Sequence, residues 1–495
     1  MLAELTARNA LSNLEDPRLF REQAYIGGKW TAAGDGKVIP VTNPATEAQL
    51  GVVPALGAAE TGAAIEAAAA AFPTWRKLLP QERAGYLRRW YELMIEARDD
   101  LALIMTLEQG KPLAEAEGEI AYAASFIEWF AEEARRVNIE GITPHLPGRQ
   151  MTVRREPVGV TAAVTPWNFP SAMITRKAAA ALAAGCPMVV RPASETPYSA
   201  LALAELADRA GIPAGVFSVV TGPSGPIVGA LLASPTVRAL SFTGSTEVGR
   251  KLLEGGAATV KRMSMELGGH APMIVFPEVD LEDAVAGAVA AKFQTSGQDC
   301  LAANRIYVHA SIYDRFVERF TAYVKELRVG NGLEEGVDIG PLMHERAVAK
   351  CEAHVQDALA RGGRVLTGGE RLGGCFFAPT VIAGATDDML IASEETFGPA
   401  AAVFRFEDEA EVIGRANDTI YGLAAYVWSN DLNRVARVTA ALEYGMVAVN
   451  CVKMTGAPIP FGGVKQSGLG REGSRHGLEE FTELKYVCIA VAEAA

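Results

Sequence analysis

Between residues 158 and 243 the sequence alternates apolar, strand-like segments with helix-like segments, and no other feature restricts the fold as strongly. Short strands that alternate with helical segments are typical of β-α-β units, in which each helix connects two parallel strands. We therefore predict an α/β fold with a doubly wound parallel sheet. The expected strands are 158–164, 188–192, 216–220 and 239–243, and the expected helices are 174–184, 199–210 and 225–233.

A doubly wound sheet binds its ligand beyond the carboxyl ends of its strands, which is where Asn168, Arg191 and Gly244 fall in this prediction. The last strand leads into residues 242–250, a glycine turn that opens a helix and lacks the usual GxGxxG fingerprint. A lone glycine turn is usually only a turn. After a parallel strand, however, it presents backbone N–H groups and a helix N-terminus to a phosphate.

The chain of 495 residues is too long for one hydrophobic core and should divide into two or three domains. A second α/β region begins near Glu266. Strand-like segments also occur at 140–157 and 475–491. The expected elements of the second region are strands at 273–276 and 305–309 and helices at 312–328 and 344–361. Two further helices are expected earlier, at 58–72 and 81–98.

Charge and hydropathy exclude several classes of protein. The net charge is −13, from 46 basic and 59 acidic residues, which argues against a nucleic-acid or anionic-membrane surface. No apolar run of about 18 residues or more occurs, so we predict no membrane span. Residues 1–21 contain no unbroken apolar run and do not resemble a secretory signal, so we expect a cytoplasmic protein.

The six cysteines are scattered and form no CxxC pair, so neither a metal site nor a disulfide framework is expected. Cys300 stands out because it ends the segment 293–300, Phe-Gln-Thr-Ser-Gly-Gln-Asp-Cys. Glu266 lies 34 residues upstream, before two glycines, and Asn168 lies on a proline-bounded loop at 165–170. A thiol, a carboxylate base and an amide donor are the components of covalent catalysis on a carbonyl group.

In this order, the segments resemble the NAD(P)-dependent aldehyde dehydrogenase superfamily, from about residue 20 to 490. The resemblance implies a variant Rossmann sheet, a second α/β catalytic domain and a β arm that joins subunits into a homodimer or homotetramer. The five matching motifs are 165–170, 242–249, 266–269, 297–305 and 395–399. The implied domains are 20–138 with 158–265 for the cofactor, 266–450 for catalysis, and 139–157 with 475–495 for the arm.

The resemblance also implies catalytic roles. Cys300 matches the nucleophile, and Glu266 matches the base for the thiol and for the deacylating water. Asn168 and the backbone N–H of Cys300 match the oxyanion hole, and Lys177 matches a lysine in the proton path of the glutamate. An aldehyde would be oxidised through a thiohemiacetal and a thioester, with NAD or NADP as the cofactor. The implied cofactor contacts are Trp167, Arg191, Ser194, Gly244, Ser245, Glu395 and Phe397.

The cofactor segment departs from the pattern of many relatives, which have Lys at the position of Arg191. Two positions after the following proline, NAD-selective relatives often carry a glutamate that repels a 2′-phosphate, whereas this chain has Ser194. Arginine keeps the positive charge but not the point geometry of lysine. Ser194 and Arg191 therefore predict that NADP is accepted as well as NAD.

Within the superfamily, residues 173–177 and 466–488 resemble succinate-semialdehyde dehydrogenases. Arg176 matches an arginine that binds the substrate carboxylate there. A second arginine is replaced by Gln294, and a serine loop is replaced by 453–458, which contains Thr455. One arginine could still bind a distal carboxylate. The further expected substrate contacts are the apolar residues Met173, Phe293, Leu301 and Phe461.

Three alternatives stay open at this point. The lost carboxylate partners are also compatible with a general or aromatic aldehyde dehydrogenase. CoA-acylating oxidation is disfavoured because the acylating relatives usually lack a carboxylate at the position of Glu266. A non-catalytic relative is disfavoured by the intact set of Cys300, Glu266 and Asn168.

Overall fold

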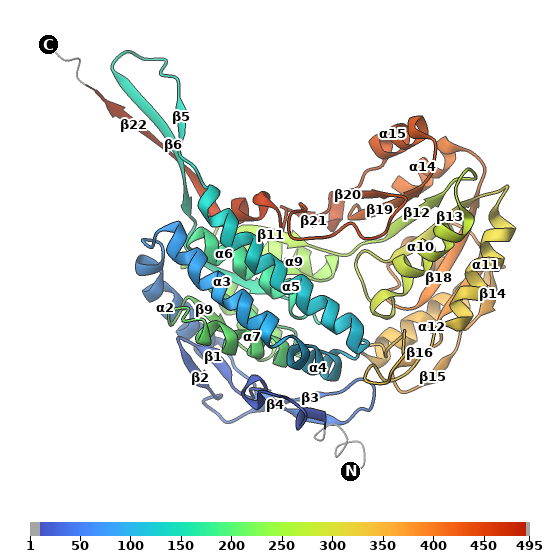
Figure 1. Cartoon of the computed structure of the whole chain (residues 1–495), viewed down its shortest axis with the longest axis horizontal. Helices are drawn as coiled ribbons and strands as arrows, with labels where there is room; N and C mark the ends of the chain where they lie inside the picture. Colours follow the sequence, from blue (N-terminus) through green and yellow to red (C-terminus); the bar gives the residue numbers. More distant parts are fainter. Residues whose placement is uncertain (1–9, 492–495) are drawn as a thin grey trace.

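The computed structural model describes residues 10–491, which form two α/β lobes and a projecting β arm (Figure 1). The predicted α/β fold is confirmed, and so is the predicted alternation of strands and helices between residues 158 and 243. The ends of these elements differ from the predicted ends by only a few residues, because turn residues rather than the hydrophobic period determine where an element stops.

The first lobe contains an eight-stranded sheet. In spatial order its strands are β2 (Lys29–Thr31), β1 (Ala24–Ile26), β9 (Phe217–Val219), β8 (Met188–Arg191), β7 (Val160–Val164), β10 (Val237–Thr243), β11 (Arg262–Glu266) and β21 (Gly468–Leu469). The strands from β9 to β11 are parallel. The chain moves outward from β7 to β9 and then from β10 to β11, so the direction of winding reverses between β7 and β10. Such a reversal opens a ligand-binding crevice.

Helices cover both faces of this sheet because successive side chains of each buried strand point to opposite faces. In β7, Val164 packs in one core and Ala163 in the other. On the Ala163 side lie α3 (Pro80–Glu96), α4 (Arg98–Gln109), α5 (Leu113–Glu133), α6 (Ala172–Ala184) and α7 (Pro197–Arg209), and on the Val164 side lie α2 (Ala58–Trp75), α8 (Ser224–Ala233) and α9 (Thr246–Ala257). Among the helices of residues 10–491, none has the length and apolar character that crossing a membrane requires.

The second lobe contains a seven-stranded sheet, parallel except for β14. Its strands in spatial order are β14 (Arg364–Thr367), β17 (Thr380–Ala385), β18 (Ala400–Phe406), β13 (Ala303–His309), β12 (Ala271–Val275), β19 (Ala424–Trp428) and β20 (Met446–Val449). Its helices are α10 (Leu281–Phe293), α11 (Tyr313–Glu326), α12 (Glu345–Ala360), α13 (Leu390–Ser393), α14 (Glu409–Asn417) and α15 (Leu432–Ala441). The winding of this sheet reverses between β12 and β19.

The smaller elements complete the two lobes. The two-stranded sheets of the described chain are β3 (Val38–Thr42) with β4 (Gln49–Pro54) and β15 (Arg371–Gly373) with β16 (Phe376–Phe377). The 3-10 helices are η1 (Pro17–Leu19), η2 (Ala134–Arg136), η3 (Gln294–Gly297), η4 (Lys465–Ser467) and η5 (Arg475–Phe481).

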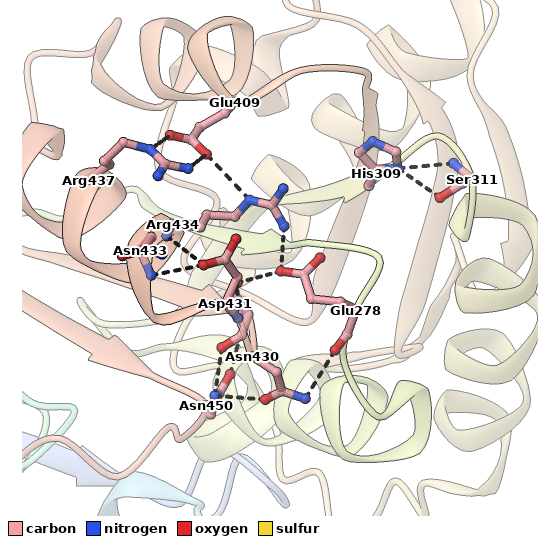
Figure 2. Close-up of polar contacts among 11 residues, drawn as sticks. Glu278, His309, Ser311, Glu409, Asn430, Asp431, Asn433, Arg434, Arg437 and Asn450 are labelled. Carbon is pink, nitrogen blue, oxygen red and sulfur yellow. Dashed lines mark hydrogen bonds and ion pairs between the residues drawn. The ribbon is translucent and has the colours of Figure 1, made fainter.

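The two sheets meet edge to edge. β11 ends at Glu266 and β12 begins at Ala271, so residues 267–270 lead directly from the carboxyl edge of the first sheet to the amino edge of the second. The carboxyl edge of the second sheet lies away from this junction, and its polar groups are paired within the protein. Arg434 Nη1 donates to the Glu278 carboxylate, and Asp431 Oδ1 accepts the Arg434 backbone N–H at 3.2 Å (Figure 2). Any site at the junction of the lobes therefore combines the carboxyl edge of one sheet with the amino edge of the other.

The arm is a three-stranded antiparallel sheet that extends away from the first lobe (Figure 1). It contains β5 (Glu140–Ile142), β6 (Arg149–Pro157) and β22 (Thr482–Ala490). The strand-like character expected from residue 475 is wrong for the first part of that segment, because 475–481 form η5 and pack on α6. Residues 492–495, predicted to belong to the arm, lie outside the described residues.

Candidate active site

A cavity of about 1100 Å³ lies where the two sheets meet. Its walls come from the loops that follow β7, β10 and β11 and from the segments that precede β13 and β18. The predicted site residues that line it are Trp167, Asn168, Met173, Arg176, Gly244, Ser245, Gln294, Cys300, Leu301, Glu395, Phe397, Thr455 and Phe461. Tertiary folding thus brings together motifs that are far apart in the sequence.

The turn before Cys300 is held in a strained conformation. Thr295 and Ser296 have φ angles of 49° and 57°, in the left-handed region that side chains with a Cβ atom disfavour. Gln298 anchors this turn to the second lobe, because its side-chain oxygen accepts a hydrogen bond from the Met343 backbone N–H at 2.9 Å. Gly269 is required beside the turn, because a Cβ atom there would overlap the carbonyl oxygen of Cys300.

The surroundings of Cys300 favour its protonated thiol over the thiolate. Burial raises its pKa well above the ordinary value, and the negative charges of Asp299 and Glu395 raise it further. Only the thiolate is a strong nucleophile. The site therefore needs a base that removes the thiol proton during the reaction.

Asn168 is positioned by a buried ion pair that sequence reasoning did not detect. Lys111 Nζ donates to Glu119 at 2.6 Å and to the backbone oxygen of Asn168 at 2.8 Å. Glu119 in turn accepts the backbone N–H of Ser171 at 3.0 Å, just before α6. The Asn168 amide reaches the nucleophile loop, where its Nδ2 donates to the backbone oxygen of Gln298 at 2.9 Å. Lys111 precedes α5 and Glu119 is one of several glutamates in that helix, so no local pattern in the sequence marks this pair.

Glu266 lies behind the cavity wall rather than in the cavity lining. It is 2% exposed, and within residues 10–491 its carboxylate oxygens have no hydrogen-bond partner. Burial raises its pKa well above the ordinary value, and the charge of Glu472 adds to this effect. Gly462 permits the close packing, because a Cβ atom there would approach Glu266 Oε1 to 2.9 Å. A carboxyl group with a raised pKa is suited to accept a proton near neutral pH.

Glu472 is the main buried residue that sequence reasoning missed. It accepts a hydrogen bond from Arg176 Nε at 2.6 Å, from Ser241 Oγ at 3.1 Å and from Lys177 Nζ. Although burial opposes ionisation, Lys177 and Arg176 hold the pKa of Glu472 below its ordinary value. Lys177 also donates to Thr243 Oγ1 at 2.7 Å and does not line the cavity within the described chain. The sequence marked Glu472 only as the last residue of the Gly-rich segment 460–472.

The predicted phosphate and nicotinamide contacts surround one end of the cavity. Ser245 caps the N-terminus of α9 by accepting the Val248 N–H, and Gly244 is required because a Cβ atom there would overlap the Phe242 ring. The rings of Trp167 and Phe397 meet edge to face at 5.6 Å. The first turn of a helix presents free N–H groups to a pyrophosphate, so this end of the cavity fits a dinucleotide.

The predicted adenosine contacts are adjacent to each other but lie outside the cavity lining in the described part of the protein. Arg191 Nη2 donates to Ser194 Oγ at 2.8 Å and to the backbone oxygen of Gly222 at 3.1 Å. Arg191 Nε has no hydrogen-bond partner among residues 10–491. A buried N–H without a partner fits a ligand oxygen.

The predicted substrate contacts surround the other end of the cavity. The Arg176 guanidinium lies 4.0 Å from the centre of the Phe461 ring, and its Nη2 contacts the sulfur of Met173 at 3.1 Å. Tyr122, which sequence reasoning missed, also lines this end and lies close to Arg176 and Thr455. The position of Phe293 differs from the prediction, because it packs on Phe320 in the core and is not part of the cavity lining of the described chain.

Comparison with known proteins identifies the class. The profile of the aldehyde dehydrogenase family matches residues 30–487, and the chain belongs to this family. Family members oxidise aldehydes with NAD or NADP.

Three relatives and one solved structure show where the chain stands in the family. A glutarate-semialdehyde dehydrogenase of Pseudomonas putida is 58% identical (97% of this chain, 100% of the relative), and an NADP-dependent succinate-semialdehyde dehydrogenase of Escherichia coli is 57% identical (97% and 100%). A non-phosphorylating aspartate-semialdehyde dehydrogenase of Halomonas elongata is 56% identical (98% and 98%). The crystal structure of an aldehyde dehydrogenase from Brucella melitensis biovar abortus has a TM-score of 0.97 at 56% identity (97% and 100%).

Proposed function

We propose that the protein oxidises a semialdehyde to the corresponding carboxylic acid with NAD(P)+. The observation that carries this proposal is Arg176, which is 1% exposed, lines the same cavity as Cys300 and keeps its Nη1 without a hydrogen-bond partner within residues 10–491. A buried guanidinium N–H that faces a cavity is complementary to a carboxylate. The relatives named above act on semialdehydes of different length and substituents, so identity alone does not select one.

The described geometry supports a two-stage reaction. The sulfur of Cys300 adds to the aldehyde carbon after its proton is removed, and Glu266 is the proposed base. The Asn168 amide and the Cys300 backbone N–H stabilise the oxyanion of the thiohemiacetal. NAD(P)+, when held beside Trp167 and Phe397, would supply the hydride acceptor that converts the thiohemiacetal on Cys300 to a thioester.

The second stage releases the acid. Glu266 removes a proton from water, the hydroxide adds to the thioester carbonyl, and the thiolate of Cys300 leaves. Lys177 and Glu472 form the proposed path that carries the proton of Glu266 away, because they form the adjacent buried ion pair. Raised and lowered pKa values in neighbouring carboxyl groups are a recurrent feature of acid–base sites.

The first lobe is the proposed cofactor domain and the second the proposed catalytic domain. Ser245 and Gly244 would hold the pyrophosphate, Glu395 and Phe397 the ribose and nicotinamide, and Trp167 would flank them. Arg191 with Ser194 would accept a 2′-phosphate, so both NADP and NAD are proposed cofactors.

The arm is the proposed surface of a homodimer or homotetramer. It carries exposed apolar side chains on strands that project from the lobe, and such surfaces mark protein interfaces. The exposed apolar residues of the arm include Ile142, Leu146, Leu484, Tyr486 and Ile489. The proposed compartment is the cytoplasm, because all six cysteines, which lie within residues 10–491, are free thiols.

The test compares succinate semialdehyde with butanal, a neutral aldehyde of equal length. We expect a higher kcat/KM for the semialdehyde, and Arg176→Gln should reduce this preference by about tenfold or more, because a charged hydrogen bond is worth about 1.5–3 kcal/mol. Arg83→Gln is the matched control, since Arg83 is also buried but bonds to the backbone of Ala183 and Leu78. If butanal is the better substrate of the parent, a general or aromatic aldehyde dehydrogenase is the correct assignment.

A further inference from the structure

Asp299, immediately before the nucleophile, places a carboxylate in the substrate cavity. Its Oδ1 accepts the Leu301 N–H at 2.9 Å, which closes a local turn. In the described part of the chain Asp299 forms no ion pair, although the charges of Lys111 and Arg176 lower its pKa against the effect of burial. A turn alone does not require a charge, because asparagine closes the same turn with its side-chain oxygen.

Glu115 adds a second carboxylate to the same wall. Both of its oxygens lie 3.1 Å from the Thr295 N–H, and it lines the cavity. Burial raises the pKa of Glu115 to about 7, and the charge of Asp299 contributes to the shift. Lys111, whose charge lowers the pKa of Glu115, already bonds to Glu119 and to the backbone of Asn168. Neither carboxyl group forms an ion pair within residues 10–491, and burial raises the pKa of both although the charge of Lys111 lowers it.

The same cavity also offers a cation. Arg176, 1% exposed, keeps Nη1 without a hydrogen-bond partner in residues 10–491, and the hydroxyl-bearing side chains of Tyr122 and Thr455 lie nearby. One cavity thus combines two carboxyl groups that form no ion pair in the described chain with a guanidinium that bonds to Glu472 through Nε and keeps Nη1 free for a ligand. The complementary ligand carries both charges.

We infer that the preferred semialdehyde is an amino-acid semialdehyde, whose ammonium group pairs with Asp299 and Glu115 while its carboxylate pairs with Arg176. This inference rests on the proposed semialdehyde function and specifies its substrate class. A simple semialdehyde leaves the two acids without a counter-ion, and an amino-aldehyde without a carboxylate leaves Arg176 Nη1 unpaired.

Asp299 also connects recognition with reactivity. Apart from burial, its charge is the largest influence that raises the pKa of the Cys300 thiol. An ammonium group beside Asp299 offsets this charge, so the matching substrate makes the thiol easier to ionise. A substrate without the ammonium group gives no such assistance.

The test uses two aldehydes with one carbon skeleton, 4-oxobutanoate and 2-amino-4-oxobutanoate, which differ only in the amino group. We expect the parent to have the higher kcat/KM for the amino compound and Asp299→Asn to reduce this preference by about tenfold or more. Asp35→Asn is the matched control, because Asp35 Oδ1 closes the same kind of turn with the Lys37 N–H at 3.0 Å on an exposed loop. The control should keep the preference of the parent.

Butanal separates the two levels of the proposal. If 4-oxobutanoate is preferred to butanal but the amino group gives no advantage, the amino-acid inference is wrong and the semialdehyde function stands. If butanal is preferred to both, the semialdehyde function itself fails. An unchanged preference in Asp299→Asn also overturns the inference. The pH profile of Cys300 alkylation is an independent readout, and Asp299→Asn should move it to lower pH.

Discussion

Both sheets reverse their winding, the first between β7 and β10 and the second between β12 and β19. At the carboxyl edge of the first sheet the Glu266 carboxylate has no hydrogen-bond partner within residues 10–491, whereas at the carboxyl edge of the second sheet the charged side chains bond to protein groups. At the carboxyl edge of the first sheet, called the first edge below, Glu266 ends β11 in a buried position, and burial raises its pKa well above the ordinary value. On the second edge, Glu278 bonds to Ser429 and Arg434, which lower its pKa although partial burial opposes them (Figure 2). The same topology therefore supports a reactive site in one lobe and a closed ion-pair network in the other.

The difference shows why topology alone does not locate a site. Asp431 on the second edge uses its carboxylate to cap α15, with Oδ1 accepting the Asn433 N–H at 2.8 Å. Arg434 bridges Glu278 and Glu409 and lies 4.5 Å from the centre of the Phe276 ring. Groups whose hydrogen-bonding capacity is already used by the protein have little left to offer a ligand.

The largest contrast is expected at the nucleophile. Cys300→Ala should abolish aldehyde oxidation, because no covalent intermediate forms, while NAD(P) binding stays close to that of the parent. Steady-state NAD(P)H formation and cofactor titration by fluorescence measure the two effects. Turnover within about tenfold of the parent, a barrier change of only about 1.4 kcal/mol, would show that Cys300 is not the nucleophile.

A large effect is also expected at Glu266. Glu266→Gln should slow turnover by about a hundredfold or more, a typical contribution of a general base, with little effect on cofactor affinity. The parent rate should rise with pH through the raised pKa of Glu266, above its ordinary value of 4.5, because the ionised form is the base. The variant should lose this rising limb. Rapid-mixing and steady-state rates across pH provide the measurement.

Glu278→Gln is the matched control from the second edge. It replaces a carboxyl group with a lowered pKa outside the cavity, so the pH profile of turnover should stay that of the parent. A shifted pH profile in this control would contradict the claim that only the carboxyl edge of the first sheet takes part in catalysis.

A moderate effect is expected at the cofactor end of the first edge. Ser194→Glu should shift the preference from NADP towards NAD. The new carboxylate would repel a 2′-phosphate and would also pair with the Arg191 guanidinium, which otherwise attracts that phosphate. The ratio of kcat/KM for the two cofactors is the measurement. An unaltered ratio, or a parent that prefers NAD by more than about a thousandfold, roughly 4 kcal/mol, would contradict the prediction of dual use.

The smallest effect is expected on the second edge. Arg434→Ala should leave kcat within about twofold of the parent and lower the free energy of unfolding by about 1 kcal/mol, because its ion pairs are partly exposed and screened. Urea unfolding and steady-state assays test this. Arg437→Ala, which removes a more exposed partner of Glu409, should cost less, and a large loss of activity in either variant would show that the second edge is functional.

Much of the first lobe and the central site followed from the sequence. The strands from 158 to 243 are short, apolar and separated by helical periods, so local patterns indicate the parallel sheet. Cys300, Glu266 and Asn168 were found because glycines and prolines mark their turns. Gly269 shows the reason, since only glycine permits the carbonyl of Cys300 to approach so closely.

Other members of the site became visible only in the folded chain. Glu472 lies 295 residues from its partner Lys177, and no local pattern marks such a pair. Phe293 belongs to the core because the last turn of α10 faces α11. Lys111, between α4 and α5, and Glu119, in α5, support Asn168 from a region in which no element was predicted.

By itself, the sequence determined the alternation of strands and helices, the turns that carry the thiol, the carboxylate and the amide, and the family to which the chain belongs. The tertiary structure alone decided which charges are paired and which remain free to meet a ligand. The physical reason is that hydrophobic period and turn chemistry act over a few residues, whereas desolvation and Coulomb interactions depend on every group that folding brings within a few ångströms.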